Sequence, residues 1–106
     1  LAVLISTLLI IPAFVAKADI PATVAVLDTA LDTNIPQFKD KIAYEVCILE
    51  WNSCANGKSF IEGAGAASMP LAQMQKNGFD HGTQMASLAV TTNPNIKIVF
   101  IRILKS

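Results

Sequence analysis

The stretch Thr23-Val-Ala-Val-Leu27, which is followed by Asp28, decides the fold class of this chain. It is a short, continuous apolar run, which predicts a strand buried on both faces, as in a parallel sheet. Residues 96–104 form a second run of this kind and predict another central strand. Residues 81–90 have small or unbranched side chains and predict a helix between strands. This order of elements predicts an α/β fold with a mainly parallel sheet flanked by helices.

The segment between these runs holds one further strand and several loops. Residues 41–50 alternate between an apolar set and a mixed set, which predicts a strand with one face partly exposed. The apolar set is Ile42, Tyr44, Val46 and Ile48, and the mixed set is Ala43, Glu45, Cys47 and Leu49. Turn-forming or small residues predict irregular structure over residues 29–38, 52–58 and 62–70, and residues 71–76 predict a short helix.

Length and composition exclude several classes of protein. The chain has 106 residues, which fits at most one domain. Apolar residues make up 53% and charged residues 15%, so the chain can form a buried core and is unlike a disordered protein. Eight Lys and Arg balance eight Asp and Glu, and no basic block occurs. These charges argue against a nucleic-acid partner.

The first 18 residues differ from the rest in composition. An apolar and hydroxyl-bearing stretch over residues 1–11, followed by the small-x-small site Ala16-Lys17-Ala18, is typical of a secretory signal peptide. We therefore predict a signal peptide over residues 1–18, truncated at its start, and a domain over residues 19–106. The product is expected to be secreted or periplasmic, without stable membrane association once the signal is removed. A membrane anchor and a buried helix are the alternatives, although a membrane span needs about 20 apolar residues.

Two cysteines, Cys47 and Cys54, lie close together in the sequence. In an oxidising compartment this spacing can close a small loop as a disulfide, which fits the predicted export. Two free buried thiols and a redox pair are the alternatives. Zinc is not expected, because two cysteines and one histidine are too few ligands for a closed site. Trp51 and Phe60 are expected to pack against this loop.

Asp28 and His81 are the candidate catalytic residues. Asp28 closes the first strand, and sites in parallel sheets form beyond the carboxyl ends of the strands. His81, the single histidine, opens the predicted helix. The helix N-terminus disfavours its protonated form, whereas a nearby carboxylate stabilises that form and fixes the tautomer, so the histidine can act as a general base. The alternatives are a turn or capping role for Asp28 and a capping or surface role for His81.

Two segments carry a resemblance to a known family. Val24-Ala-Val-Leu-Asp-Thr-Ala-Leu-Asp32, with Pro36 after it, and His81-Gly-Thr-Gln-Met-Ala-Ser87 resemble the aspartate and histidine motifs of the subtilisin-like serine peptidases (subtilases, peptidase S8). The resemblance covers residues 22–104, apart from the segment around the cysteines. It implies a subtilisin-like fold and a peptide or protein substrate. It also implies that Asp28 accepts the Nδ1–H of His81, and that His81 takes the proton of a serine hydroxyl.

The chain departs from the family pattern at three places. Ala30 stands where the family has Gly, and it would be strained if the position requires a positive φ. Gln37 stands where many relatives have a calcium-binding Asp, so neither calcium nor another cofactor is predicted. The nucleophile motif Gly-Thr-Ser-x-Ala and the oxyanion Asn do not occur in the 106 residues.

We therefore expect the N-terminal part of a longer endopeptidase, incomplete and inactive on its own. One alternative is a non-catalytic relative that keeps the fold as a binding or scaffold module. The other is an unrelated α/β module in which Asp28 and His81 never meet.

Overall fold

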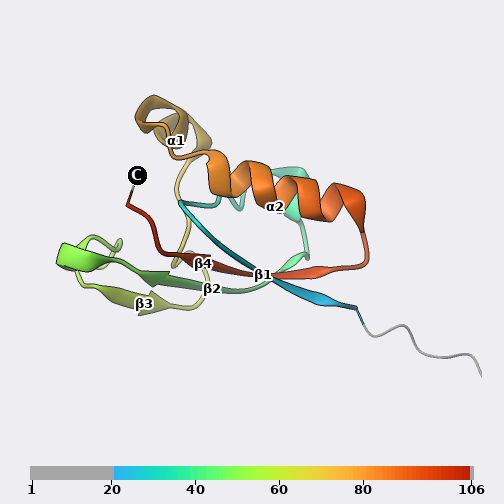
Figure 1. Ribbon diagram of the computed structural model, residues 1–106, viewed down its shortest axis with the longest axis horizontal. Helices are drawn as coiled ribbons and strands as arrows, with labels where there is room; N and C mark the ends of the chain where they lie inside the picture. Colours follow the sequence, from blue (N-terminus) through green and yellow to red (C-terminus); the bar gives the residue numbers. More distant parts are fainter. Residues whose placement is uncertain (1–20, 106) are drawn as a thin grey trace, which may run out of the picture.

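The computed structural model describes residues 21–105 and contains one four-stranded sheet in the order β1-β4-β2-β3 (Figure 1). The strands are β1 (Thr23–Asp28), β2 (Ile42–Ile48), β3 (Phe60–Glu62) and β4 (Lys97–Arg102). β4 pairs in parallel with both β1 and β2, whereas β2 and β3 are antiparallel. The helices are α1 (Leu71–Asn77) and α2 (His81–Thr92), with short 3-10 turns at Pro36–Phe38 and Glu50–Asn52. The predicted α/β fold is confirmed, and the sheet is mixed, with two parallel pairings and one antiparallel pairing.

The predicted signal peptide over residues 1–18 lies outside the described residues. Within residues 21–105, no helix has both the length and the apolar character to cross a membrane.

The core lies between α2 and the sheet, and β4 is central as predicted. Ile98 and Phe100 of β4 are fully buried, and Ala86 and Val90 of α2 pack in the same cluster. Both helices lie on one side of the sheet (Figure 1). The prediction that β1 is buried on both faces is therefore wrong for the described residues, because Leu27, on the strand, is 54% exposed.

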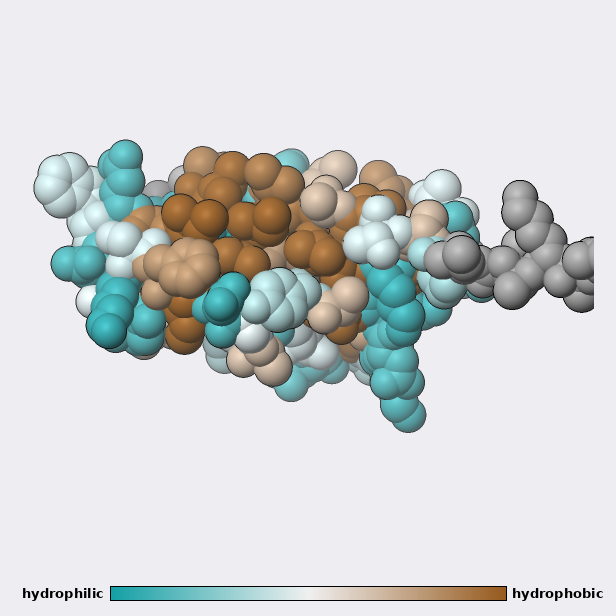
Figure 2. Space-filling model, turned by 90° about the horizontal axis from the view of Figure 1, so that it is seen from below, coloured by the Kyte–Doolittle hydropathy of each residue, from teal (hydrophilic) through white to brown (hydrophobic). Residues whose placement is uncertain are grey.

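The face of the sheet turned away from the helices is apolar. Figure 2 shows this face, on which hydrophobic side chains gather into one broad patch. Its most exposed members come from all four strands or their ends: Leu27, Tyr44, Ile48, Phe60 and Ile103. Parallel sheets normally have both faces covered, so the uncovered face accounts for the unusual exposure of these residues.

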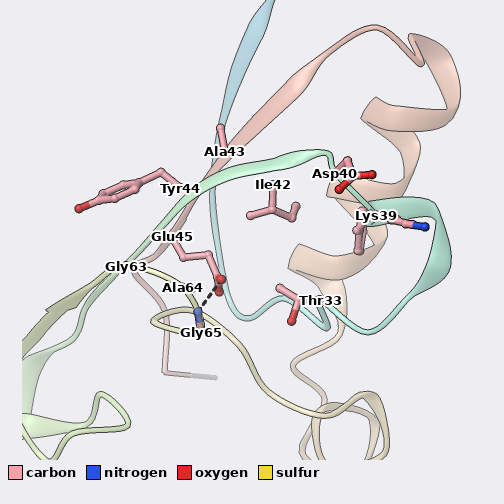
Figure 3. A pocket seen from close by; sticks show the side chains of 11 residues that line it. Thr33, Lys39, Asp40, Ile42, Ala43, Tyr44, Glu45, Gly63, Ala64 and Gly65 are labelled. Atoms are coloured by element: carbon pink, nitrogen blue, oxygen red, sulfur yellow. Dashed lines mark hydrogen bonds between the residues drawn. The ribbon is translucent and has the colours of Figure 1, made fainter.

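The two faces of β2 are opposite to expectation. Glu45 and Cys47, from the mixed set, are buried, whereas Tyr44 and Ile48, from the apolar set, are exposed. Burial of Glu45 is possible because its carboxylate accepts hydrogen bonds from Gly65 N (2.7 Å), Ala67 N (3.2 Å) and Ser68 Oγ (2.8 Å). Figure 3 shows Glu45 directed at Gly65 beside a pocket of about 460 Å³. The carboxylate thus anchors the small-residue loop between β3 and α1.

β3 was not expected, and it forms a hairpin with β2 that a disulfide closes. Cys47 and Cys54 are joined, with a Cα–Cα distance of 6.0 Å, and no free cysteine is present. The alternative of two free thiols is therefore contradicted. Cys47, Cys54 and Leu49 form a small second core. The expectation that Trp51 packs against this loop is wrong, because its side chain projects into solvent and the residue is 85% exposed.

Candidate active site

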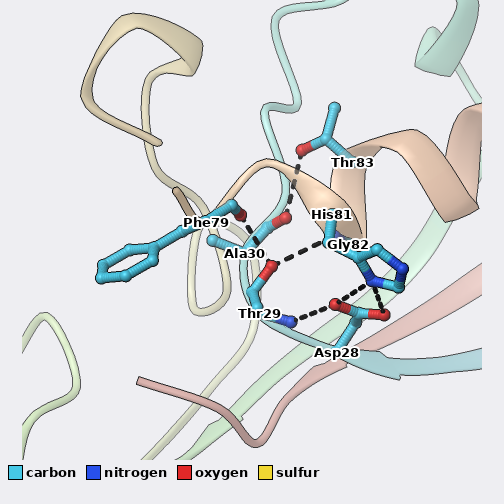
Figure 4. Close-up of polar contacts among 7 residues, drawn as sticks. All are labelled: Asp28, Thr29, Ala30, Phe79, His81, Gly82 and Thr83. Atoms are coloured by element: carbon cyan, nitrogen blue, oxygen red, sulfur yellow. Dashed lines mark hydrogen bonds and ion pairs between the residues drawn. The ribbon is translucent and has the colours of Figure 1, made fainter. Parts of the chain in front are cut away.

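Asp28 and His81 come from opposite sides of the core and meet at the carboxyl edge of the sheet. Asp28 is the last residue of β1, and His81 is the first residue of α2, 53 residues further along the chain. His81 Nδ1 lies 2.8 Å from Asp28 Oδ2 and 3.0 Å from Oδ1 (Figure 4). The alternative in which these two side chains never meet is therefore wrong.

The carboxylate is held from a second direction. The backbone N–H of Thr29 donates to Asp28 Oδ1 at 2.7 Å, so both oxygens have partners. The Asp28 side chain is 11% exposed, whereas that of His81 is 64% exposed. The Nδ1 atom of the His81 ring therefore contacts a buried carboxylate, and most of the rest of the side chain is exposed to solvent. When Nδ1 carries the proton, Nε2 is left with a lone pair that can accept a proton from a neighbouring molecule.

Two threonines fix the start of α2 against the end of β1. Thr29 Oγ1 donates to the carbonyl of Phe79 at 2.6 Å and accepts from the N–H of Gly82 at 3.1 Å. Thr83 Oγ1 donates to the carbonyl of Ala30 at 3.1 Å and accepts from the N–H of Asp32 at 3.0 Å. Sequence reasoning assigned neither threonine this role, although both lie inside the motif segments. Their side chains set the separation at which the His81 ring and the Asp28 carboxylate meet.

Gly82 allows the close approach that this contact needs. A Cβ at this position would lie 2.7 Å from Phe100 Cζ, 2.8 Å from the carbonyl oxygen of Ala30 and 3.1 Å from Asp28 Cβ. A side chain of any size would push α2 away from β1. The residue after the histidine therefore has to be glycine for steric reasons.

Ala30 adopts no strained conformation. The non-glycine residues with positive φ, within residues 21–105, are Asp40, Trp51 and Asn52. The condition for strain at Ala30, a positive φ, is therefore not met. Its methyl group is fully buried.

Two other charged residues, Asp32 and Arg102, lie near this edge of the sheet. Asp32 accepts from the N–H of Asn34 at 2.9 Å and from the N–H of Leu71 at 3.1 Å, so it ties two loops together. Arg102 is the register partner of Asp28 on β4, and burial lowers the pKa of its guanidinium group. Within the described part of the chain, no group of three His, Cys, Asp or Glu side chains is arranged to hold a metal ion.

The serine hydroxyls of the described chain are occupied elsewhere or lie apart from the ring. Ser68 donates to Glu45, Ser53 to the carbonyl of Trp51, and Ser59 to Asn52. No serine of residues 21–105 is hydrogen-bonded to His81, whose partner in this region is Asp28. Within residues 21–105, the site is thus a histidine ring oriented by a carboxylate, with no serine hydroxyl bonded to it.

Comparison of this chain with models of known protein families, with curated proteins and with solved structures finds no match.

Proposed function

We propose that this chain provides the Asp–His half of the active site of a secreted serine-type endopeptidase. The observation that carries the proposal is the contact of His81 Nδ1 with both oxygens of the buried Asp28 carboxylate, at 2.8 and 3.0 Å. Pattern alone placed these residues at the ends of a strand and of a helix. Two neighbouring residues of the histidine motif support this contact, because Gly82 allows α2 to lie close to β1 and Thr83 bonds to the chain after β1.

The geometry supports a proton relay. Asp28 accepts the Nδ1–H of His81 and so leaves Nε2 unprotonated on the exposed side of the ring. Nε2 would take the proton of a serine hydroxyl as that oxygen attacks a peptide carbonyl, and would return it to the leaving amine. The ionised carboxylate stabilises the imidazolium that forms between these two steps. Asp28 thereby orients and supports the base without changing its own protonation.

The nucleophile and the oxyanion donors would come from polypeptide outside these 106 residues. One oxyanion donor is typically worth about 10²–10³ in turnover, and loss of the nucleophile costs more. The 106-residue chain is therefore expected to be inactive towards peptides. In this proposal the substrate is a peptide or protein, and the fold belongs to the subtilisin-like class.

A serine-directed fluorophosphonate probe tests the proposal on the full-length gene product. We expect covalent labelling that is lost in the His81→Ala variant and strongly slowed in the Asp28→Asn variant. Gln84→Ala is a matched control, because Gln84 lies on the same helix and its side chain contacts Asp80 rather than the site. Absence of labelling in the unaltered protein would contradict the peptidase proposal and favour the non-catalytic binding or scaffold module.

Secretion is tested separately. The Cys47–Cys54 disulfide is compatible with an oxidising compartment. N-terminal sequencing of exported material should find a mature chain that starts at or near Asp19. A mature protein that retains Leu1 would contradict the signal-peptide assignment.

A further inference from the structure

Arg102, at the end of β4, is a buried cation whose side chain has no partner within residues 21–105. The residue is 7% exposed, and its Nε atom is buried without a hydrogen-bond partner. The buried carboxylates of the same region, on Asp28, Asp32 and Glu45, all accept hydrogen bonds. Because buried charges are normally paired and hydrogen-bonded, the unpartnered guanidinium group needs an explanation.

The position of Arg102 is at the carboxyl edge of the parallel strands. β4 lies between β1 and β2 (Figure 1). Buried residues alternate along β4, so Arg102 follows Ile98 and Phe100 on the side of the strand that faces the core. Its register partners are Asp28 on β1 and Cys47 on β2, which are both buried. Ligands of α/β sheets bind beyond this edge, where the strands end.

No carboxylate in the described part of the chain neutralises Arg102. The oxygens of Asp28 contact Nδ1 of His81 and the N–H of Thr29, and the ion pair formed there is the one between Asp28 and His81. Burial alone lowers the pKa of the Arg102 guanidinium group, whereas a neighbouring carboxylate would raise it. Arginine stays protonated in proteins, so loss of a proton does not relieve the cost of burial. An anion that approaches the group would relieve it.

The guanidinium group is open to such an approach from one side. Of its three nitrogen atoms, Nε is the one that is fully buried without a partner, so a small anion can reach Nη1 and Nη2. The planar group can donate two parallel N–H···O hydrogen bonds to a carboxylate. It supplies one positive charge, and Asp28 on the neighbouring strand is negative. A monovalent anion therefore fits this place, and a dianionic phosphate is repelled by Asp28.

We propose that Arg102 binds a carboxylate group at the carboxyl edge of the sheet, beside Asp28. The carboxylate belongs either to an acidic side chain of polypeptide outside these 106 residues or to a small free ligand. Both sources present the same chemistry to the guanidinium group. The inference goes beyond the proposed peptidase activity and does not depend on it.

The single arginine makes the test specific, because the Nε–H cross-peak of a ¹H–¹⁵N correlation spectrum reports on Arg102 alone. The 106-residue chain is titrated with sodium acetate and, separately, with sodium chloride at the same ionic strength. We expect acetate to move the Nε–H cross-peak in a saturable way and chloride to leave it in place. No movement in acetate, or an equal movement in chloride, would overturn the proposal. An Nε–H that exchanges with water too fast to be observed would also overturn it.

Two variants locate the acetate response. Acetate should raise the urea midpoint of the parent chain, because a ligand that binds the folded state stabilises it. Arg102→Met should abolish this rise, and its midpoint in chloride should be no lower than that of the parent, since an unpaired buried charge is replaced by an apolar side chain. Lys76→Met is the control, because Lys76 is an exposed cation on α1, and it should keep the full response. An acetate response that survives in Arg102→Met, or that is lost in Lys76→Met, would contradict the proposal.

Arg102→Lys keeps the test decisive if the methionine variant does not fold. Lysine retains the charge but not the planar fork, so acetate binding should weaken roughly tenfold, which corresponds to one charge-assisted hydrogen bond. Undiminished binding by this variant would contradict the proposal.

The full-length gene product distinguishes the two sources of the carboxylate. If an acidic side chain supplies it, acetate raises the midpoint of the 106-residue chain and leaves that of the full-length product unchanged. If a free ligand supplies it, acetate raises both midpoints. Absence of a response in the 106-residue chain overturns the proposal whatever the full-length product does. None of these measurements uses serine-probe labelling, so failure of the carboxylate site is distinguishable from failure of the peptidase proposal.

Discussion

The substitution Gly82→Ala probes the contact between α2 and β1 most sharply. The added Cβ would lie 2.7 Å from Phe100 Cζ and 2.8 Å from the carbonyl oxygen of Ala30. Both separations are below 3.0 Å, and Cβ atoms in proteins essentially never come that close to a neighbouring atom. The neighbour at 2.8 Å is main chain and cannot rotate away. Gly82, Phe100 and Ala30 are all buried, so relief requires α2 to move.

The size of the effect follows from two opposing contributions. Overpacking of a buried site typically costs about 1–3 kcal/mol, and two simultaneous contacts place this site at the upper end. Alanine in place of glycine in a helix contributes about 1 kcal/mol in the opposite direction. We therefore expect the free energy of unfolding to fall by about 2 kcal/mol. The shift of α2 should also withdraw the His81 ring from Asp28.

Urea unfolding followed by circular dichroism measures the change. Thr91→Ala is the control, because Thr91 is an exposed residue of the same helix and its substitution should stay within about 0.5 kcal/mol. A Gly82→Ala variant that is as stable as the parent chain, or more stable, would refute the steric argument for glycine at this position.

Three further predictions concern the supports of the fold and site. Thr83→Val removes a hydroxyl with two buried backbone partners and should cost about 1–3 kcal/mol in urea unfolding; a change within 0.5 kcal/mol, roughly the scatter of surface substitutions, would contradict its structural role. A hydrogen bond to Glu62, burial and the negative charge of Glu62 raise the pKa of Tyr44, so Glu62→Ala should lower the midpoint of the tyrosinate absorbance of this single tyrosine. Because folding raises the pKa of Tyr44, the stability linked to this residue is present below its unfolded-state pKa and is lost as pH rises through its folded-state pKa. An unchanged midpoint of the tyrosinate absorbance in Glu62→Ala would refute the contact between Tyr44 and Glu62. Replacing Cys47 and Cys54 together by serine should lower stability by about 2–3 kcal/mol, and an unaltered urea midpoint would show that the hairpin needs no cross-link.

Local pattern was sufficient for the parallel strands and for α2. β1 and β4 are continuous apolar runs, and α2 begins at the predicted residue, His81. The pattern failed on the faces of β2, because its alternation reports hydrophobicity and not burial. Ile48 belongs to the uncovered face, whereas Glu45 is buried by hydrogen bonds to a loop about 20 residues away in sequence. The sequence of the strand alone does not reveal hydrogen-bond partners that lie in a distant loop.

In the candidate site too, local sequence predicted some features, whereas others depend on contacts between distant segments. Asp28 and His81 were predicted from their positions at element ends and from the motifs around them. The bridging roles of Thr29 and Thr83 depend on the distance between α2 and β1, which sequence does not give. The exposure of Trp51 was also missed, because an aromatic residue between two cysteines is typical of a packed loop. Trp51 has a positive φ of 59° in the loop that the Cys47–Cys54 disulfide closes.

The uncovered face of the sheet affects how unfolding and spectroscopic experiments on this chain should be done. Its apolar residues come from neighbouring strands, since Leu27 and Val46 both pair with Ile101. Contiguous exposed apolar surface favours association. Spectroscopy on this chain is therefore best done at low protein concentration.

The central claim is that Asp28 accepts the Nδ1–H of His81 and leaves Nε2 as the base. Long-range ¹H–¹⁵N correlation spectra test it directly, because the chain has one histidine. In neutral imidazole we expect the proton on Nδ1 and a bare Nε2, and we expect the Asp28→Ala variant to move the proton towards Nε2. A proton on Nε2 in the parent chain, or a spectrum that Asp28→Ala leaves unchanged, would contradict the account.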